Sequence, residues 1–272
     1  MDRNLKIGIV GLGLIGGSIF KALCALKCNV CAVSKSNLTL QKARHYCENV
    51  SKSLLILRDC DVIFACTHIN KTPEILDGLD KILPSTAIVA DVCSLKRFIS
   101  VKKRNYTFIP THPMAGAEFS GFDASFESLF QNTKWILTPL EDNDNSDIVK
   151  VTDIIEALGA KPIFTSPNEH DEAVALISHM PMLVSQALFK TAQTNKLALK
   201  LASSGFRDMT RLALSNEEMA QDMIDLNSDN MQNAILKLYT SIGELLNKDY
   251  KTQISKIKIE RETMYVNGKN IL

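Results

Sequence analysis

The sequence has almost no net charge. Its 272 residues include 31 lysines and arginines against 30 aspartates and glutamates, which leaves a formal charge of +1. A chain without an excess of either sign has no global field to hold a nucleic-acid backbone or an anionic membrane surface. We therefore expect neither nucleic acid nor a membrane as a partner, and local positive charge wherever a small anionic ligand binds.

Cysteine is absent beyond residue 93. All seven cysteines lie within the first 93 residues, and an odd number without a secretory signal favours reduced thiols in the cytoplasm. Cys28 and Cys31 spell C-x-x-C in a segment that is predicted to be a strand, where positions three apart face opposite sides. No second pair stands at the spacing of a zinc finger. We therefore expect a cytoplasmic protein without a structural zinc site.

Long apolar runs and paired histidines are also missing. No stretch reaches the roughly 20 apolar residues that a bilayer span needs. Residues 7–20 are uncharged, as the core of a signal peptide would be, but five of these fourteen residues are glycine, which disfavours a helix. None of the five histidines pairs at i and i+4 with a carboxylate ligand, so we expect no metal site.

The chain does contain ample material for a hydrophobic core. Hydrophobic residues make up 46% and charged residues 22% of the sequence, and the mean hydropathy is +0.02, values typical of a soluble globular protein. A length of 272 residues indicates one large or two medium domains. We expect no room for a third, regulatory domain.

Short β-branched runs alternate with amphipathic stretches up to about residue 165. Strands are predicted at residues 5–10, 29–34, 61–67, 86–92, 106–110, 134–139 and 161–165. The helices predicted between them include residues 14–26, 38–46 and 146–158. Alternation at this spacing predicts right-handed crossovers and a mostly parallel, doubly wound sheet in an α/β domain that spans residues 1–165.

The rest of the chain, residues 166–272, is predicted to be helical without further strands. Within it five apolar residues recur at intervals of four and three, which is typical of a coiled-coil-like seam: Met231, Ile235, Leu238, Ile242 and Leu245. The seam is either a core-facing stripe inside one chain or a subunit interface.

The first predicted strand runs directly into a G-x-G-x-x-G pattern and then into a helix. In this context Gly11 permits a tight turn, Gly13 lets the backbone approach a pyrophosphate, and Gly16 allows the helix to pack closely on the strand. The helix N-terminus would present its N–H groups to the phosphates. We therefore predict a dinucleotide site at this turn, with Leu14 and Ile15 also beside the cofactor.

The end of the second predicted strand carries Ser34, Lys35 and Ser36, where an acidic residue would hold the ribose 2′-hydroxyl of NAD. Two hydroxyls and an ammonium group can instead hydrogen-bond and neutralise a 2′-phosphate. The turn therefore favours NADP over NAD, unless it is only a solvated turn. Thr67, the last residue of the next predicted strand, is a further candidate for contact with the cofactor.

Three short segments hold the polar residues from which a catalytic site can be built. DVCSLK, which contains Ser94, and THPMAGAE, which contains His112 and Glu118, each follow a predicted strand. Open α/β sheets bind their ligands at the carboxyl ends of strands. GFRDMTR, which contains Arg207 and Arg211, lies in the helical half.

His112 is the strongest candidate for a general base. It lies in a loop constrained by proline and glycine, and a neutral imidazole accepts a proton near pH 7. His179, in a predicted apolar helix, is either a site residue or a core histidine. Arg207 and Arg211 are four apart on one predicted helix face, where they either grip a carboxylate or pair with acidic neighbours. Three other histidines have no surroundings that single them out: His45, His68 and His170.

Taken in order, these motifs resemble those of the prephenate and arogenate dehydrogenases of tyrosine biosynthesis. The resemblance covers nearly the whole chain and rests on GLGLIGGS, DVCSLK, THPMAGAEFSG, ISHMP, GFRDMTR and a following helix with Asn227 and Asn230. It implies an α/β Rossmann domain followed by an all-α substrate and dimerisation domain at residues 166–272. It also implies a homodimer, in which residues 231–245 would be interface.

The family oxidises and decarboxylates a cyclohexadienyl acid, so the resemblance implies prephenate as the small-molecule substrate and NADP or NAD as the cofactor. His112 matches the catalytic histidine that takes the proton of the C4 hydroxyl, Ser94 the serine that hydrogen-bonds this histidine or the hydroxyl, and Arg211 the arginine that holds a substrate carboxylate. The other expected substrate-binding residues are His179, Asp171, Arg207 and Glu118.

Three positions depart from the family pattern. Met182 replaces a second histidine that many relatives have three residues after the position of His179, Ser34 replaces the acidic residue of NAD-using relatives, and His68 stands where proline is usual. Arogenate, or both substrates with NADP, is therefore the alternative to prephenate. A dinucleotide-binding sensor without catalysis is a third hypothesis.

Overall fold

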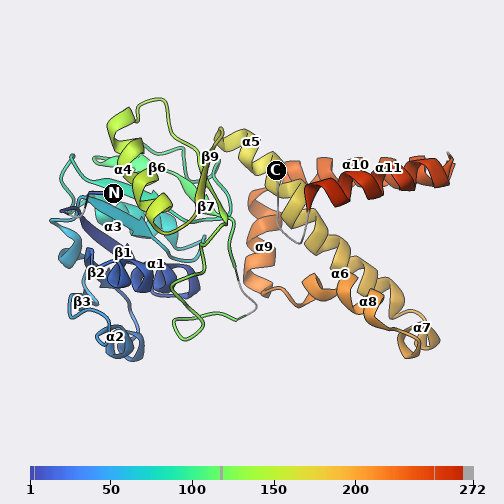
Figure 1. The fold of residues 1–272 in the computed structure, drawn as a ribbon, viewed down its shortest axis with the longest axis horizontal. Helices are drawn as coiled ribbons and strands as arrows, with labels where there is room; N and C mark the ends of the chain where they lie inside the picture. The colour runs from blue at the N-terminus through green and yellow to red at the C-terminus, as the bar shows by residue number, and fades with distance from the viewer. Residues whose placement is uncertain (3, 117–118, 248, 266–272) are drawn as a thin grey trace. The chain divides into compact units, whose positions relative to one another are not determined.

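The computed structural model describes residues 1–2, 4–116, 119–247 and 249–265 (Figure 1). Contacts divide the chain into two compact units. Unit 1 comprises Met1–Val174 and Ser215–Asn227, and unit 2 comprises Ala175–Leu214 and Ser228–Leu272. The division into domains at residues 1–165 and 166–272 stays a prediction.

The centre of unit 1 is a six-stranded parallel sheet with the order β3-β2-β1-β4-β5-β6. Its strands are β1 (Lys6–Val10), β2 (Asn29–Val33), β3 (Val50–Ser51), β4 (Val62–Ala65), β5 (Ile88–Asp91) and β6 (Thr107–Ile109). This is the strand order of a doubly wound Rossmann sheet, which confirms the predicted fold class. β3 was not predicted because a strand of two residues has no periodicity.

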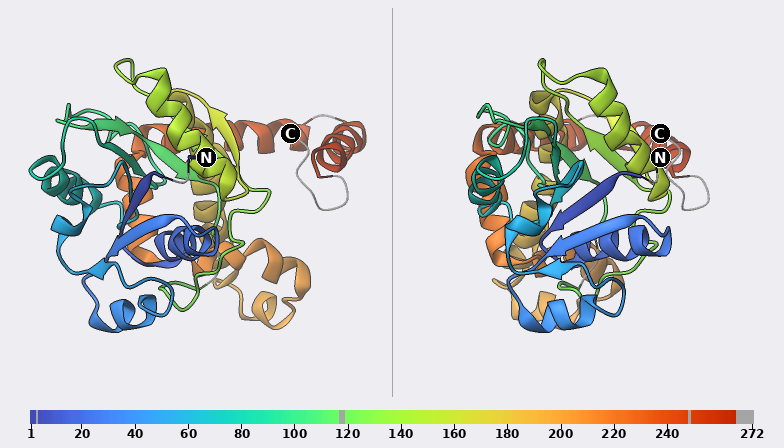
Figure 2. Two further views of the ribbon diagram at one scale, coloured as in Figure 1. Left: turned by 60° about the vertical axis from the view of Figure 1, so that its left-hand side comes forward. Right: turned by 90° about the vertical axis from the view of Figure 1, so that its left-hand side faces the viewer.

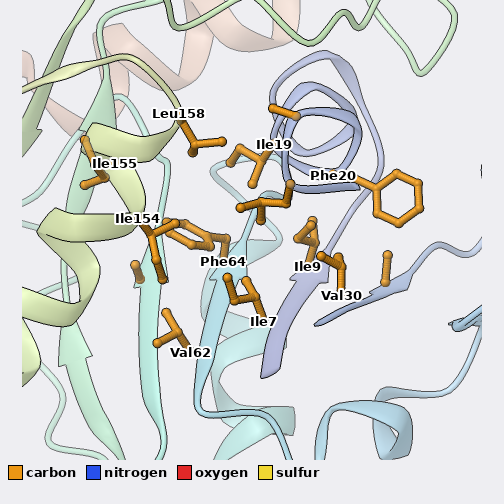
Figure 3. Packing of buried hydrophobic residues seen from close by; sticks show 14 of the residues in the cluster. Ile7, Ile9, Ile19, Phe20, Val30, Val62, Phe64, Ile154, Ile155 and Leu158 are labelled. Atoms are coloured by element: carbon orange, nitrogen blue, oxygen red, sulfur yellow. The ribbon is translucent and has the colours of Figure 1, made fainter. Parts of the chain in front are cut away.

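Side chains of alternate strand residues belong to two hydrophobic cores, one on each face of this sheet. Ile7 and Phe64 belong to the core that includes side chains of α1 (Leu14–Ala25) and α4 (Asn145–Ala157), as Figure 3 shows. Ile63 and Val89 belong to the other core, with side chains of α3 (Thr72–Asp80). The views in Figure 2 show these helices covering opposite faces of the sheet. Burial on both faces explains why the strands are continuous apolar runs.

Two predicted strands belong to a second sheet rather than to the main one. β8 (Lys134–Leu137) pairs antiparallel with β7 (Thr111–Pro113) and parallel with β9 (Lys161–Phe164). The prediction that placed His112 in a loop is therefore wrong, because His112 is the central residue of β7 and lies opposite Ile136. Pro110 separates β7 from β6, and the chain changes sheet there.

Beyond residue 166 the described part of the chain contains helices and no strand, as predicted. Unit 1 includes α5 (Pro167–Val174), α9 (Glu217–Leu226) and the short α2 (Asn37–Ala43) and η1 (Leu54–Leu57). Unit 2 consists of a π-helical turn (Ala175–His179), α6 (Met180–Ala192), α7 (Lys196–Lys200), α8 (Ser204–Met209), a 3₁₀ turn (Arg211–Leu214), α10 (Ser228–Asn247) and α11 (Tyr250–Met264).

One helical run, Pro167–Ala192, is long and apolar enough by length and composition to cross a membrane. The expectation that no such segment exists was too strong, because a helix with scattered polar residues can reach the mean hydropathy of a span without an unbroken apolar run. A helix of a soluble protein passes the same test. Only 28% of the apolar window is buried within the chain.

The predicted seam lies on α10 and changes character along the helix. Met231, at the start, is buried, whereas Ile242 is 48% exposed. Further large apolar side chains of α10 are exposed beside it: Leu236, Tyr239 and Leu246. The first part of the seam therefore packs within the chain, and its second part forms an apolar surface of unit 2.

Candidate active site

The glycine turn after β1 is open beside the N-terminus of α1. Gly11 has a φ of +91°, which favours glycine. A Cβ on Gly16 would stand 1.9 Å from the Gly11 carbonyl oxygen, so only glycine lets α1 pack against the turn. A Cβ on Gly13, the N-cap of α1, would meet nothing within 4 Å. The turn thus has room for a diphosphate next to Leu14 and Ile15, whose N–H groups have no acceptor within the helix.

The other cofactor candidates lie at the ends of neighbouring strands. The Ser34 Oγ accepts a hydrogen bond from the Ser36 N–H (3.3 Å), and the Ser36 Oγ caps α2 by accepting one from the backbone three residues on (3.2 Å). Each hydroxyl keeps its own hydrogen for donation, and Lys35 is exposed. Thr67, after β4, lies against the glycine turn, since its Cγ2 would be 3.2 Å from a Cβ on Gly11.

A buried ion pair joins the end of β5 to the start of β7. The ammonium group of Lys96 lies 2.5 Å from the Asp91 Oδ2 and donates to the Thr111 carbonyl oxygen, also at 2.5 Å, and neither charged side chain is exposed. Thr111 returns two bonds to Asp91, from its N–H to Oδ1 (3.1 Å) and from its hydroxyl to the carbonyl oxygen (2.5 Å). Trp135 donates its indole N–H to the Thr111 Oγ1 (2.9 Å). This network fixes the backbone beside His112.

His112 is the first member of a chain of three hydrogen-bonded side chains. Its Nδ1 lies 3.0 Å from the Nε2 of His170, and the Nδ1 of His170 lies 2.8 Å from the Oδ1 of Asp171. His170 is 3% and Asp171 1% exposed, whereas His112 is half-buried. The geometry is that of a half-buried imidazole connected through a buried imidazole to a buried carboxylate, an arrangement in which His112 is the candidate base.

Asp171 is held firmly by the protein backbone. Its Oδ1 also accepts the Lys96 N–H (2.8 Å) and its Oδ2 accepts the Arg97 N–H (2.9 Å). The Asn227 side-chain amide donates to the Asp171 carbonyl oxygen (2.8 Å). Both carboxylate oxygens thus act as acceptors inside unit 1.

Sequence reasoning missed His170. The hydrogen bond that gives it a role comes from a residue 58 positions earlier in the chain, which no local pattern reveals. Its one local signal is the adjacent Asp171. His68 was also set aside, yet its Nδ1 lies 3.5 Å from the Oδ2 of Asp222. His45, the third histidine that the sequence did not single out, is exposed on the turn after α2.

Ser94 and the nearby thiols complete this part of unit 1. Ser94 is half-buried in the segment between β5 and Lys96. Burial raises the pKa of the Cys93 thiol well above its usual range, and also that of the Cys66 thiol. Neither is a thiolate near neutral pH, which leaves His112 as the candidate base here. In the described part of the chain no cluster of His, Cys, Asp or Glu side chains is arranged to hold a metal ion.

The remaining candidates belong to unit 2 or lie outside the described residues. His179 is buried and ends the π-helical turn before α6. Arg207 is in α8 and Arg211 begins the following 3₁₀ turn, so their expected place on one helix face is wrong. Both nevertheless line one cavity of about 470 Å³, although Arg207 is also 3.5 Å from Asp208. Glu118 lies outside the described residues.

Models of two protein domains match the chain. A prephenate dehydrogenase nucleotide-binding domain matches residues 24–164, and a prephenate dehydrogenase dimerization domain matches residues 166–255. A cyclohexadienyl dehydrogenase of Zymomonas mobilis is 30% identical over 234 residues, which are 80% of this chain and 79% of that protein. A prephenate dehydrogenase of Bacillus subtilis is 29% identical over 81% of this chain and 64% of its own length.

Solved structures give the same picture. An arogenate dehydrogenase of Synechocystis superposes with a TM-score of 0.81 at 33% identity, over 96% of this chain and 97% of that one. A prephenate dehydrogenase of Aquifex aeolicus, in complex with hydroxyphenyl propionate and NAD+, superposes with a TM-score of 0.86 at 27% identity, over 96% and 98% of the two chains.

Proposed function

This chain belongs to the prephenate dehydrogenase family, and from that premise we propose that it converts prephenate to 4-hydroxyphenylpyruvate with hydride transfer to NADP. The coarser assignment, a nicotinamide-dependent dehydrogenase of tyrosine biosynthesis, holds for prephenate, arogenate and cyclohexadienyl substrates alike. The observation that carries the proposal is His112, backed by a buried imidazole and a carboxylate.

His112 performs the proton transfers of this reaction. Its Nε2 hydrogen-bonds the C4 hydroxyl of the substrate and takes the hydroxyl proton, with Ser94 holding the same hydroxyl. When bound, the nicotinamide accepts the hydride from C4. The bond from the ring to its carboxylate then breaks, the electron pair enters the ring, and His112 returns the proton to the phenolate. The products are a phenol, CO2 and the reduced cofactor, with no net proton released.

The arginines bind the substrate but do not drive the reaction. Arg211 pairs with the side-chain carboxylate, and Arg207, on the same cavity, adds positive charge for a dianion. Strong pairing with the ring carboxylate would resist loss of CO2, so the arginines orient the substrate through its other carboxylate. Glu118 stays in the proposal as a substrate-binding residue, whereas Asp171 and His179, each 1% exposed, act from behind the side chains that contact the substrate.

The glycine turn provides a direct test of where the cofactor binds. Gly13→Ala is expected to raise the dissociation constant for NADPH by about tenfold or more, because its Cβ would enter the open space beside the helix N-terminus. Its melting temperature should stay near that of the wild type. Gly16→Ala is the comparison, since its Cβ meets the Gly11 carbonyl oxygen and should lower the melting temperature as well as the affinity for NADPH. Wild-type affinity in Gly13→Ala would place the cofactor elsewhere.

The substrate and cofactor are tested together by initial rates for prephenate and arogenate, each with NADP and NAD. The proposal expects prephenate with NADP to give the largest kcat/KM. The Ser34 and Lys35 side chains support NADP, because they offer donors and a positive charge to a 2′-phosphate. A strong preference for arogenate would decide for the alternative substrate. No turnover in any of the four combinations would contradict the proposal and favour the hypothesis of a dinucleotide-binding sensor.

We further propose a homodimer through the helical unit. The match to a dimerization domain and the exposed Tyr239 (77%) and Leu246 (79%) on α10 support it, because a surface of this kind is normally covered. Sedimentation equilibrium should give twice the 30.1 kDa chain mass. A Leu246→Glu variant, which introduces a charge into that surface, should shift the equilibrium toward monomer. A wild type that remains monomeric at high concentration would contradict this interface.

A further inference from the structure

We propose that His170 and Asp171 are a positioning pair that determines which ring nitrogen of His112 carries its proton. The inference deepens the proposed function and rests on His112 being its base. It stands on two distances, 3.0 Å between the imidazoles of His112 and His170 and 2.8 Å between His170 and the Asp171 carboxylate. His170 has no direct place at the substrate, since it is 3% exposed.

The direction of the hydrogen bonds follows from Asp171. Its two oxygens accept the backbone N–H groups of Lys96 and Arg97, so the carboxylate is an acceptor on every side. The Nδ1 of His170 must therefore be the donor to Asp171. With one proton on the ring, the Nε2 of His170 is then an acceptor.

The same reasoning applies to the hydrogen bond between His170 and His112. Because the Nε2 of His170 accepts, the Nδ1 of His112 must donate to it. The single proton of neutral His112 is thereby held on Nδ1, and the lone pair is on Nε2, the nitrogen that takes the substrate proton. This is the ordering that a carboxylate imposes on the histidine of a serine-protease triad, extended here by one imidazole.

Burial makes the arrangement rigid. Lys96 contacts both ends of this series of hydrogen-bonded side chains. Its N–H donates to Asp171, and its ammonium group donates to the Thr111 carbonyl oxygen next to His112. Water does not compete for the His170 and Asp171 hydrogen bonds, because both side chains are almost fully buried. When His112 becomes an imidazolium, its Nδ1–H donates to an imidazole already polarised by a carboxylate, which stabilises the charge.

The tautomer can be observed without any substrate. The chain has only five histidines, so imidazole 1H–15N correlation spectra of the full-length protein with 15N-labelled histidine are simple to read. His112→Asn and His170→Leu identify the two signals. The proposal expects His112 to carry its proton on Nδ1 in the wild type and to become a mixture of tautomers in His170→Leu. A His112 protonated on Nε2 in the wild type would overturn it.

Paired substitutions at residue 170 separate positioning from packing. Leucine fills a similar volume but makes neither hydrogen bond, whereas the amide of His170→Gln can donate to Asp171 and accept from His112. His170→Leu is expected to lower kcat by about 10- to 100-fold with KM and NADPH affinity little changed, less than the roughly 10⁴-fold loss that a wrong tautomer causes in a serine protease. His170→Gln should recover most of that loss. His45→Leu, at an exposed position, should leave kcat unchanged.

The outcomes distinguish this inference from the proposed function. If the wild type turns over prephenate or arogenate and His170→Leu keeps full kcat, or if leucine and glutamine reduce it equally, the positioning pair is wrong and the proposed function stands. If the wild type turns over neither compound, the proposed function fails, and the spectra still report the tautomer of His112. A His170→Leu variant that does not fold leaves the wild-type spectrum and the His170→Gln kinetics as the deciding measurements.

Discussion

Replacing His112 by asparagine is expected to lower kcat by about 10²- to 10⁴-fold, the contribution of a general base. Asparagine keeps a polar side chain of modest size on β7, but its amide does not accept a proton near pH 7. The hydride transfer then has to proceed without removal of the hydroxyl proton. The measurement is the pre-steady-state and steady-state formation of reduced nicotinamide from the preferred substrate.

Two controls make this result specific. The affinity of His112→Asn for NADPH should match that of the wild type, because the glycine turn follows β1 in the middle of the main sheet, whereas His112 lies on β7 of the second sheet. His45→Asn removes an exposed histidine on the turn after α2 and should retain full activity. A kcat within a factor of a few of the wild type in His112→Asn, with intact cofactor binding, would remove His112 from the mechanism.

Lys96→Met is expected to cost about 3–5 kcal/mol of unfolding free energy, because it leaves the buried Asp91 carboxylate without its cation. Asp91 would keep only neutral donors, the N–H groups of Cys93 and Thr111. The single tryptophan, Trp135, is buried in the same network and donates to Thr111, so its fluorescence reports local unfolding in urea.

Lys102→Met is the matched control for Lys96→Met. Lys102 makes the same kind of pair, 2.9 Å from Asp77, but the lysine side chain is 55% exposed, so its removal should cost no more than about 1 kcal/mol. The double variant Asp91→Asn with Lys96→Met removes both charges and should recover part of the loss. If Lys96→Met is no less stable than Lys102→Met, the buried pair does not hold the site together.

The strands and the glycine turn were predictable because their signals are local. Strands buried on both faces are apolar runs, and a turn that admits no Cβ at residue 16 requires glycine. Each feature therefore gives a pattern that can be recognised within a short stretch of sequence. β7 was not predictable, because three residues with a proline carry no strand pattern and the pairing partner, β8, lies about 20 positions later.

The roles of Lys96, His170 and Asp171 depend on contacts between distant parts of the chain. A lysine in DVCSLK gives no sign that it is fully buried, since lysine is nearly always exposed. The Asp171 carboxylate was expected at the substrate, yet in unit 1 it accepts bonds from residues 74 and 75 positions away. The place of Arg207 and Arg211 on one helix was wrong because α8 ends at Met209, which a spacing of four residues does not reveal.

The central claim, oxidative decarboxylation with His112 as base, is tested most directly by product stoichiometry. Reduced nicotinamide and CO2 are measured together from prephenate or arogenate with the wild type and with His112→Asn. The account predicts one equivalent of each per molecule of substrate with the wild type, at equal rates, and a large loss of both with His112→Asn. Reduced nicotinamide formed without CO2, or no reduced nicotinamide from either substrate, would contradict it.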